Sequence, residues 1–313
     1  MFARELKPGD GQIAAEIWEP YLPPDPNRRA WLAEVIDAGC EDGVFRGAMV
    51  LDAGISAGFG LSAFIPDHIA EAFMAEAEPY LNDRLLRRWK DGDKSMFLDR
   101  EGQASGNSGD GLELLILEGC GNTKTGHEII DYDLINAIIP AYHRVHDGFN
   151  VKRHLHETEL KYANVQYSGG NQKLCDLVIQ HPFSMSAAGH GPRAMFGLSR
   201  RMIDRHNITG HANVVLHYVP PILGLLPREQ QICTLALSGL TDVEVAGRIG
   251  ISRDAVKQYW QVIYGRMDAR VPDVLQSASP EGNSVRRGPE KRRRALAYIQ
   301  MHLAELRPHL AND

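Results

Sequence analysis

Closely spaced histidines are the first candidates for chemistry in this chain. His143 and His146 lie three residues apart on a predicted helix, and His154-Leu-His156-Glu157 follows. Imidazole nitrogens and a carboxylate are ligands that zinc and other transition metals accept. No cysteine joins them at a known zinc spacing, and the pattern favours ordinary surface and core histidines over a metal site. We therefore predict no metal, with His154 and His156 as the alternative ligands.

The segment Gly119–Thr125 follows a predicted strand and has some of the residues of a phosphate-binding loop. It lacks the glycine directly before Lys124 and is one residue short of the usual spacing, so it favours a surface turn. No nucleophile and base can be paired from the sequence. The histidines and this loop therefore predict no catalytic residues, and we expect the chain not to be an enzyme.

A polar stripe near the C-terminus suggests a different chemistry. Ser252 is a good N-cap for a helix that follows it. One side of that helix is apolar, formed by Val256, Trp260, Ile263 and Met267. The other side is rich in hydrogen-bonding groups, with Asp254, Lys257, Gln258 and Gln261. A helix with one face in a core and such a face outward can enter a DNA major groove.

Two shorter helices are predicted before this one. Pro227 and Glu229 suit the first turn of a helix that Gly239 would end. Thr241 and Glu244 form a capping-box pattern for a second helix, and Gly250 provides the turn into the third. The spacing is that of a helix-turn-helix unit.

The residues from Leu226 to Met267 resemble the DNA-binding domain of LuxR-type (NarL/FixJ-like) transcription regulators, over about 50 of the 313 residues. The matching motifs are Leu226-Pro-Arg-Glu, Gly239-Leu-Thr, Glu244-Val-Ala, Ile249-Gly-Ile-Ser252, Val256-Lys257, Ile263-Tyr264 and Arg266-Met267. The resemblance implies four helices, the fourth starting near Val271–Leu275, with the third reading DNA. The implied DNA-binding residues are Ser252, Arg253, Asp254, Ala255, Lys257, Gln258, Tyr259 and Gln261.

This sequence departs from the family pattern at three positions. Ala255 replaces a usual threonine, Tyr259 a common histidine and Asp268 a common glycine. The first two changes alter expected phosphate contacts. A plain three-helix module and region four of a sigma factor have similar patterns and stay as alternatives.

A basic run follows, with six Lys and Arg residues between positions 286 and 294. It is either a solvated charge run or a source of phosphate contacts. The candidate phosphate contacts are Thr241, Arg286, Arg287, Lys291, Arg292, Arg293 and Arg294. The apolar residues Leu296, Ile299, Leu303 and Leu306 then form a stripe on a final helix, which needs a partner surface.

Charge and cysteine content limit the function classes. Residues 223–313 have 13 Lys/Arg and 10 Asp/Glu, a balance of +3, whereas the rest has 21 and 30, a balance of −9. Only the C-terminal part suits a polyanion. The four cysteines form no Cys-x-x-Cys pair, and no export signal or membrane-spanning run is visible. We expect a cytoplasmic protein that does not contact a membrane.

The first 219 residues mix strand and helix patterns. Strands are predicted at 44–51, 59–65, 112–117 and 214–218, helices at 28–39, 67–89 and 128–154, and a loop at 101–111. Pro140 is expected to break or kink the third helix. These elements favour an α/β or α+β sandwich of the kind that small-molecule sensors use. A phosphoacceptor receiver and an autoinducer-binding domain are weaker alternatives.

The sequence therefore predicts an α/β or α+β sensor domain at 1–219, an all-α four-helix LuxR-type helix-turn-helix domain at 220–278, and a basic linker with an amphipathic C-terminal helix at 279–313. The predicted function is sequence-specific transcription regulation by a homodimer that binds double-stranded DNA and RNA polymerase. No cofactor is predicted, although an unidentified small ligand could gate binding. The alternative is a metal-binding or catalytic N-terminal domain with a helical protein-interaction module.

Overall fold

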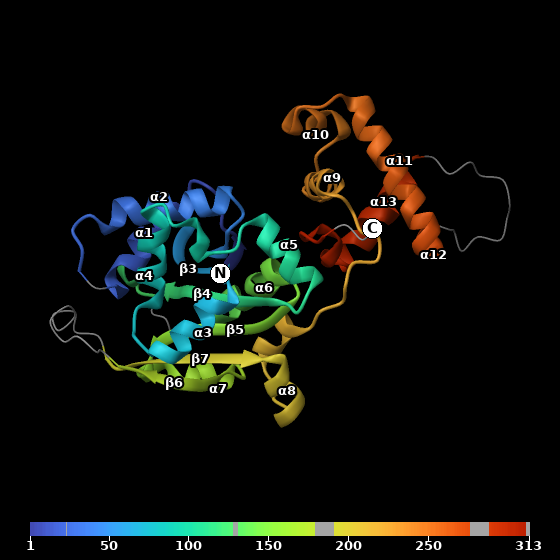
Figure 1. Cartoon of the computed structure of the whole chain (residues 1–313). Helices are drawn as coiled ribbons and strands as arrows, with labels where there is room; N and C mark the ends of the chain where they lie inside the picture. Colours follow the sequence, from blue (N-terminus) through green and yellow to red (C-terminus); the bar gives the residue numbers. More distant parts are fainter. Residues whose placement is uncertain (23, 128–130, 179–190, 276–287, 311–313) are drawn as a thin grey trace. The chain divides into compact units, whose positions relative to one another are not determined.

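The computed structural model describes the whole chain except residues 23, 128–130, 179–190, 276–287 and 311–313 (Figure 1). The chain separates into two compact units, Met1–Tyr218 and Val219–Asp313. Each unit has its own buried apolar cluster.

The first unit is built on one seven-stranded sheet in the order β1-β2-β3-β4-β5-β7-β6. Neighbouring strands are antiparallel except β4 and β5, which are parallel. The strands are β1 (Phe2–Glu5), β2 (Phe45–Asp52), β3 (Ile55–Ile65), β4 (Leu112–Gly121), β5 (Val151–Glu159), β6 (Gln172–Leu177) and β7 (Arg193–Ser199).

The sequence explains the hairpin that joins β2 and β3. Ala53 and Gly54 form the two-residue turn, and both have positive φ angles, of 47° and 86°. Two successive positive φ angles give a turn whose twist matches that of the flanking strands. Asp52 consequently pairs with Ile55, and the hairpin continues to Phe45 opposite Ala63.

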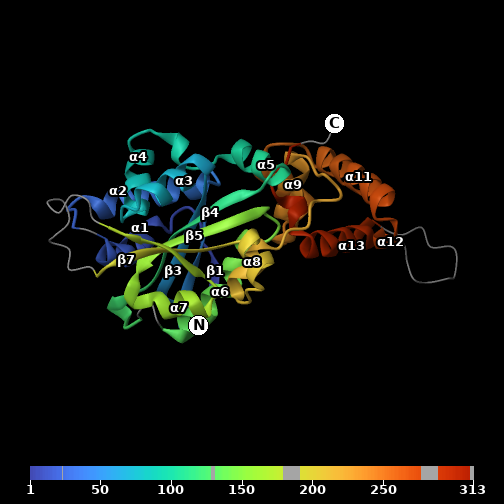
Figure 2. The ribbon, with the colours of Figure 1, turned by 60° about the horizontal axis from the view of Figure 1, so that its bottom comes forward.

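Helices cover both faces of this sheet (Figure 2). Helices α1 to α4 lie against one face, and α6 and α7 lie against the other. The α-helices of the first unit are α1 (Gly11–Trp18), α2 (Arg28–Glu41), α3 (Asp67–Glu76), α4 (Leu81–Lys90), α5 (Arg100–Ser108), α6 (Tyr132–His146), α7 (Ala163–Ser168) and α8 (Arg200–His206). Short 3₁₀ helices include Lys94–Met96 and His211–Leu216.

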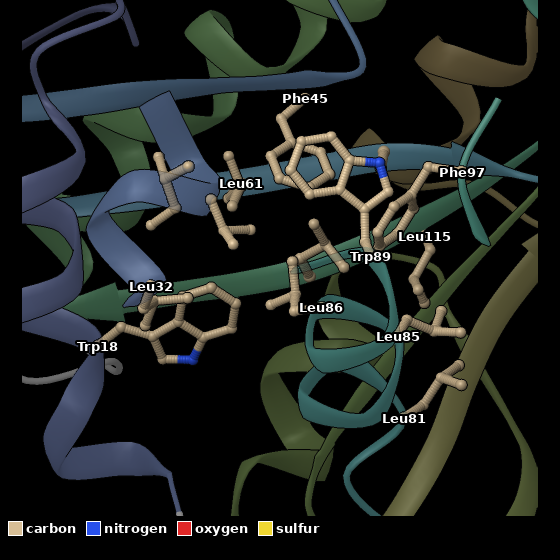
Figure 3. Close-up of a cluster of buried hydrophobic side chains, with 14 of the residues drawn as sticks. Trp18, Leu32, Phe45, Leu61, Leu81, Leu85, Leu86, Trp89, Phe97 and Leu115 are labelled. Atoms are coloured by element: carbon tan, nitrogen blue, oxygen red, sulfur yellow. The ribbon is translucent and has the colours of Figure 1, made fainter. Parts of the chain in front are cut away.

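The larger apolar core lies between the sheet and α1, α2 and α4 (Figure 3). Trp18, Leu32 and Leu86 are fully buried there, and Leu61 and Leu115 reach them from the sheet. Trp18 and Phe59 pack with ring centroids 6.0 Å apart. Burial of large side chains on this scale is the main source of folding free energy.

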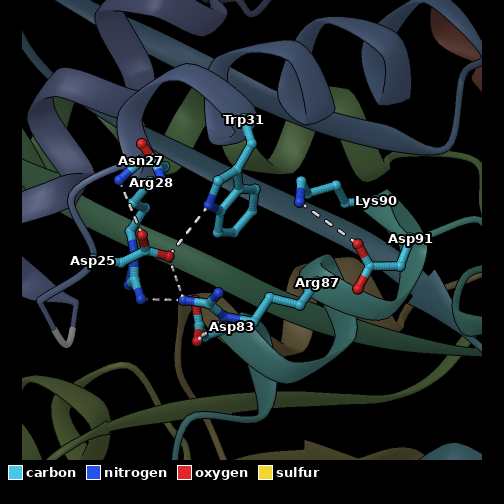
Figure 4. A network of polar contacts seen from close by, with 8 residues as sticks. All are labelled: Asp25, Asn27, Arg28, Trp31, Asp83, Arg87, Lys90 and Asp91. Carbon is cyan, nitrogen blue, oxygen red and sulfur yellow. Dashed lines mark hydrogen bonds and ion pairs between the residues drawn. The ribbon is translucent and has the colours of Figure 1, made fainter.

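A polar network ties α2 to α4 at the edge of this core (Figure 4). Asp25 accepts from Arg87 at 2.8 Å, and Arg87 also donates to Asp83 at 2.8 Å. The guanidinium of Arg28, only 1% exposed, lies 3.3 Å from Asp83, and burial lowers the pKa of Arg28. The two helices are thus joined by paired charges as well as by apolar contact.

The structure confirms some predicted elements of the first unit and corrects others. The strands predicted at 44–51, 59–65 and 112–117 are present as β2, β3 and β4. The predicted loop at 101–111 is mostly helix α5, because Asp99 caps it by accepting from Gly102 N at 2.9 Å. The strand predicted at 214–218 is wrong, because a 3₁₀ helix occupies His211–Leu216.

The predicted helix at 128–154 is wrong after His146, and residues 128–130 lie outside the described residues. Helix α6 continues through Pro140 and ends at His146, after which the chain enters strand β5. The predicted sensor-type sandwich is also wrong. A single mixed sheet with one parallel strand pair at its centre takes its place.

The second unit is helical in its described residues. Its α-helices are α9 (Pro227–Leu237), α10 (Asp242–Ile249), α11 (Arg253–Arg270), α12 (Pro272–Leu275) and α13 (Gly288–Met301). Thr241 and Glu244 form the capping box that begins α10, and Gly250 ends it with φ of 69°. Val256, Trp260, Ile263 and Met267 are buried with Ile299 of α13 in one cluster. Within the described ranges, no helix is long and apolar enough to cross a membrane.

Candidate functional site

Strands β4 and β5 pair along only part of their lengths. Their parallel pairing runs from Leu112 opposite Val151 to Ile116 opposite His156. Beyond this point β4 continues to Gly121 paired with β3, and β5 continues to Glu159 paired with β7. The sheet therefore opens between the carboxyl ends of its two central strands. Strand edges that face such an opening can hydrogen-bond an extended ligand.

A β-bulge in β4 begins at the opening. Leu61 of β3 lies opposite Glu118, whereas Ser62 lies opposite Ile116, so Leu117 is an extra residue in β4. A bulge bends its strand and redirects the side chains beside it. The sequence gives no direct sign of this bulge, because Leu112–Leu117 is a continuous run in which only Glu113 is polar.

The beginning of α4 connects the two diverging strands. The side chain of Asn82 donates to the carbonyl oxygen of Leu117 in β4. The carboxylate of Glu157 in β5 accepts from Tyr80 N at 2.6 Å and from Leu81 N at 2.8 Å. Arg193 of β7 completes the set, with Nε 2.6 Å from Glu157. Because α4 bonds to both strands, it holds their ends apart on this face.

A cavity of about 180 Å³ lies on the other face, between the sheet and α6. One wall is apolar and the opposite wall carries histidine, glutamine and asparagine. The apolar lining includes Leu134, Ile135, Ile138, Ile139 and Val145 of α6 and Ile116 of β4. The polar lining includes Ser62, Glu118, His146, His154, His156, Gln166, Asn171 and His211.

His154 and His156 point to the cavity side of β5, because alternate residues of a strand share a face. The ring nitrogens of His154 form no hydrogen bond within the described residues, although Asn171 lies close to it. Burial lowers the pKa of His154 to about 3 and that of His156 to about 4. Both imidazoles are therefore neutral at neutral pH.

The tautomer of His156 follows from its neighbours. Asn171 Nδ2 donates to Gln166 Oε1 at 2.8 Å, which orients the Gln166 amide so that its nitrogen faces His156. Gln166 Nε2 then donates to His156 Nδ1 at 3.0 Å. Since Nδ1 accepts, the proton of the neutral ring is on Nε2. His156 lines the cavity as a neutral N–H donor.

His146 is fixed in the opposite tautomer. Its Nδ1 lies 2.7 Å from the carbonyl oxygen of Tyr142, which can only accept, so Nδ1 carries the proton. Its Nε2 lies 2.7 Å from Ser62 Oγ, and both side chains are at most 2% exposed. The Ser62 hydroxyl also donates to the carbonyl oxygen of Arg46 at 3.1 Å, so its single proton is shared between this oxygen and His146 Nε2. With its proton on Nδ1, the His146 ring directs Nε2 at the Ser62 hydroxyl.

Glu118 is the carboxylate at the opening between β4 and β5. Burial raises its pKa, against the opposing effects of the Gly119 N–H and of the positive charge of Arg193. The Gly119 N–H donates to Glu118 Oε1 at 2.9 Å. Space is open beside Gly119, where an added Cβ would meet no atom within 4 Å. A carboxylate whose pKa is raised by burial is a stronger base than an exposed one and is a candidate proton acceptor.

The histidines singled out from the sequence are thus partly brought together. His146, His154 and His156 line one cavity, whereas His143 Nε2 donates to the backbone oxygen of His211 at 2.9 Å. In the described part of the chain, no group of three or more His, Cys, Asp or Glu side chains could hold a metal ion. The alternative ligands His154 and His156 share a face without a third ligand.

The sequence-predicted DNA-reading stripe lies on α11. Ser252 caps this helix by accepting from Ala255 N at 3.1 Å. Arg253, Asp254, Lys257, Gln258 and Gln261 are exposed, and Ala255 and Tyr259 are half-buried. Lys257 Nζ pairs with Asp254 at 3.0 Å on the same helix. The stripe is solvent-facing, and part of its positive charge is neutralised within the chain.

The predicted phosphate contacts are also paired internally where the structure describes them. Arg292 lies 2.6 Å from Asp242, and Lys291 lies 3.8 Å from Asp268. Arg293 and Arg294 each lie 2.8 Å from Glu290. The Thr241 hydroxyl donates to Glu244. Arg286 and Arg287 lie outside the described residues.

Sequence reasoning missed Ser62, Glu118 and Gln166. Glu118 was visible as a charged residue ending an apolar strand, yet the gap beside it depends on where β4 and β5 stop pairing. Ser62 and His146 are 84 residues apart, so only the fold brings them together. The alternation in His154-Leu-His156-Glu157 was a period-two strand signal that could have placed both histidines on one face.

Comparisons with known proteins give one set of matches. No family model and no curated protein matches the chain. Among solved structures, it is similar to a chain assigned to the GNAT family of acetyltransferases from Desulfovibrio desulfuricans, with 13% identity over 63% of this chain and 97% of that chain and a TM-score of 0.35.

Two further solved structures have similar values. An N-acyl amino acid synthase from uncultured soil microbes has 8% identity over 64% of this chain and 95% of that one, with a TM-score of 0.37. A spermidine N-acetyltransferase variant from Vibrio cholerae has 10% identity over 64% and 96%, with the same TM-score. Because these identities and TM-scores are low, any proposed function has to rest on the geometry of the sheet and the cavity.

The comparisons correct the interpretation drawn from the sequence. The LuxR-type resemblance is wrong as an assignment, since no family model matches and the three similar structures are acyl- and acetyltransferases. The predicted transcription regulator, its DNA and RNA polymerase partners, its homodimer and the expectation that the chain is not an enzyme are withdrawn with it. The physical reason is that caps and apolar stripes specify packed helices without specifying what their exposed face binds.

Proposed function

We propose that the first unit is an acyltransferase that moves an acyl group from a thioester to an amine. The observation that carries this proposal is the opening between β4 and β5, where Glu118 lies at the gap and an apolar cavity lies behind it. An extended, amide-bearing thioester arm, such as that of coenzyme A, suits exposed strand edges. The similar structures from soil microbes and Vibrio cholerae are named for N-acyl synthesis and N-acetyl transfer, which agrees with this proposal.

The residues at the opening have complementary roles in such a transfer. The amine nitrogen attacks the thioester carbonyl carbon, a C–N bond forms, the C–S bond breaks and the sulfur leaves as a thiolate. Glu118 accepts the proton that the amine loses, because burial raises its pKa and makes its carboxylate a stronger base than an exposed one. The N–H of His156 faces the cavity and suits the developing charge on the carbonyl oxygen.

The size of the cavity limits the length of the acyl group. Its volume of about 180 Å³ is similar to the roughly 150 Å³ of an engineered apolar cavity that accepts benzene. Its α6 wall is formed by leucine, isoleucine and valine side chains. We therefore favour a short to medium acyl chain over a bare acetyl group.

The test is an acyl-transfer assay with the full-length chain. Acetyl-, butyryl- and octanoyl-coenzyme A are each combined with spermidine or amino acids, and thiol release and product mass are measured. We expect amine-dependent thiol release that Glu118→Gln lowers by roughly 10²- to 10⁴-fold. Glu101→Gln, on α5 and exposed, is the matched control and keeps full activity.

A second variant tests the opening itself. Gly119→Val adds a side chain in open space, so it should block the thioester arm while leaving the thermal midpoint unchanged. Thioester affinity, measured by calorimetry, is expected to fall at least tenfold. Wild-type protein that releases no thiol with any donor and amine, or variants that behave as wild type, would contradict the proposal.

We also propose that the protein works in a reducing compartment. Cys40, Cys120, Cys175 and Cys233 are all free thiols. Burial raises the pKa of Cys40 and of Cys233 to about 12, so these two react slowly. Thiol titration of unfolded protein purified without reductant should find four thiols; fewer would contradict this placement.

A further inference from the structure

The cavity contains a second reactive arrangement that the transfer at Glu118 does not use. Ser62 Oγ and His146 Nε2 lie 2.7 Å apart, both side chains are buried, and both line the cavity. A serine becomes nucleophilic when a base within hydrogen-bonding reach accepts its proton and a third group orients that base. Here the carbonyl oxygen of Tyr142 is the third group, 2.7 Å from His146 Nδ1.

The orientation of His146 is constrained from several sides. Its ring packs against Tyr142 with centroids 4.5 Å apart, and against the edge of Phe64 at 6.4 Å. Tyr142 and His146 are four residues apart in α6, so their side chains share one face of that helix. The lone pair on Nε2 is therefore held toward Ser62, as a general base requires.

A donor for the acyl oxygen lies in the same row of the sheet. Ser62 pairs with Ile116, and Ile116 pairs with His156, so the three side chains lie on one face. The Nε2–H of His156 faces the cavity because Gln166 holds its Nδ1. The two histidines are thus fixed in opposite tautomers, one with a lone pair at Ser62 and one with an N–H donor.

We propose that Ser62 is a nucleophile that forms an acyl-enzyme in this cavity and gives the protein a hydrolytic activity toward esters and thioesters. Ser62 Oγ bonds to the acyl carbonyl carbon, the bond to the leaving group breaks, and His146 passes the Ser62 proton to that leaving group. Water then attacks the acyl-serine, His146 takes its proton and returns it to Ser62, and a carboxylic acid leaves. The amine acceptor and Glu118 have no part in this activity.

The experiment uses an ester that needs neither coenzyme A nor an amine. Full-length protein is mixed with p-nitrophenyl butyrate and quenched with acid, and intact mass and peptide mapping locate any added butyryl group. We expect one butyryl group on Ser62 of the wild-type protein. A wild-type protein with no adduct, or with the adduct at another residue, overturns the proposal whatever the variants show.

Variants separate the roles of the two residues. Ser62→Ala should remove the adduct, and His146→Gln should slow its formation by roughly 10²- to 10⁴-fold, measured from p-nitrophenol release. Ser62→Cys keeps a nucleophile of similar size and should carry the butyryl group as a thioester at position 62. Ser168→Ala, an exposed serine of α7, is the matched control and should acylate as wild type. An adduct that persists in Ser62→Ala at its wild-type level also contradicts the proposal.

The outcome of this acylation experiment does not depend on the outcome of the acyl-transfer assay. Loss of amine-dependent transfer in Glu118→Gln with normal acylation of Ser62 would support both proposals. Ser62 acylation without amine-dependent transfer would keep the hydrolytic activity and contradict the transferase. Amine-dependent transfer without acylation of Ser62 would keep the transferase and contradict the hydrolytic activity.

Discussion

The two faces of the central sheet differ in how they are filled. The face covered by α1, α2 and α4 holds a large apolar cluster, and Trp18, Leu32 and Leu86 in it are fully buried. The face covered by α6 and α7 holds smaller clusters and the cavity with its histidines. The first face supplies most of the apolar burial, and the second can therefore keep polar groups that folding alone would not favour.

Among the described residues, buried polar atoms without a hydrogen bond occur on both faces of the sheet, and several of them surround the cavity. His154 has no hydrogen bond at either ring nitrogen, and Asn171 Oδ1 and His211 Nδ1 have none in the described residues. Each buried polar group without a partner costs about 1–3 kcal/mol. The atoms that surround the cavity are therefore candidates for contact with a polar ligand.

The largest expected effect tests the sheet face that α1, α2 and α4 cover. Phe59→Ala removes a fully buried ring next to Trp18 and should lower the free energy of unfolding by about 3–5 kcal/mol. Ile139→Ala, on the cavity wall and only half-buried, should cost about 1 kcal/mol. Urea titrations of both variants make the comparison. Equal losses of unfolding free energy would show that the two faces contribute equally to stability.

The next effect tests the connection between β5 and α4. Glu157→Gln removes the carboxylate that hydrogen-bonds the buried Arg193 and should destabilise the protein by about 3 kcal/mol. Glu78→Gln breaks a pair with Arg84 that is about one-third exposed, and should cost under about 1 kcal/mol. Thermal midpoints distinguish the two. A Glu157→Gln protein as stable as wild type would show that α4 does not depend on this carboxylate.

Acid should destabilise the cavity face through its neutral histidines. Burial lowers the pKa of His156 to about 4 in the folded chain, so between pH 6.5 and 4 the unfolded chain binds the proton first. Stability is therefore full above pH 6.5 and falls as the pH drops, by about 3 kcal/mol for His156 alone by pH 4.

Urea midpoints at pH 7, 5.5 and 4.5 measure this loss. His156→Asn should flatten the pH dependence, and His68→Asn, an exposed control, should leave it unchanged. His154 adds to the loss in the same direction, because burial lowers its pKa to about 3. A wild-type protein with constant stability over this range would mean that both rings stay hydrated.

The smallest effect on stability tests what the cavity is for. Ile139→Trp adds volume to the α6 wall of the cavity and should change the free energy of unfolding by no more than about 1.5 kcal/mol, because Ile139 is half-buried. In the acyl-transfer assay it should raise the KM for octanoyl-coenzyme A more than that for acetyl-coenzyme A. Equal changes for the two donors would place the acyl chain elsewhere.

Several features of this protein could be predicted from local sequence. The apolar runs of β2, β3 and the first half of β4 have the length of strands, and Ala53-Gly54 allows a tight turn. Thr241 with Glu244, Ser252 and Gly250 specify where helices begin and end in the second unit. These signals act over three or four residues, so they can be recognised in the sequence without any knowledge of the fold.

The function of those helices could not be predicted from local sequence. The exposed face of α11 has the residue types of a DNA-reading helix, yet Lys257 pairs with Asp254 and Arg292 with Asp242. A sequence pattern that satisfies helix packing and solvation is shared by many modules, so it identifies a fold more readily than a ligand.

By itself the sequence determined which segments become strands or helices where a cap, a turn residue or an apolar period marks them. The tertiary structure decided how the candidate site is assembled. It set the residue at which β4 and β5 stop pairing, placed Glu118 at the gap and brought Ser62 to His146 across 84 residues. The physical reason is that strand pairing, burial and the tautomers of buried histidines depend on neighbours distant in sequence, which local patterns do not encode.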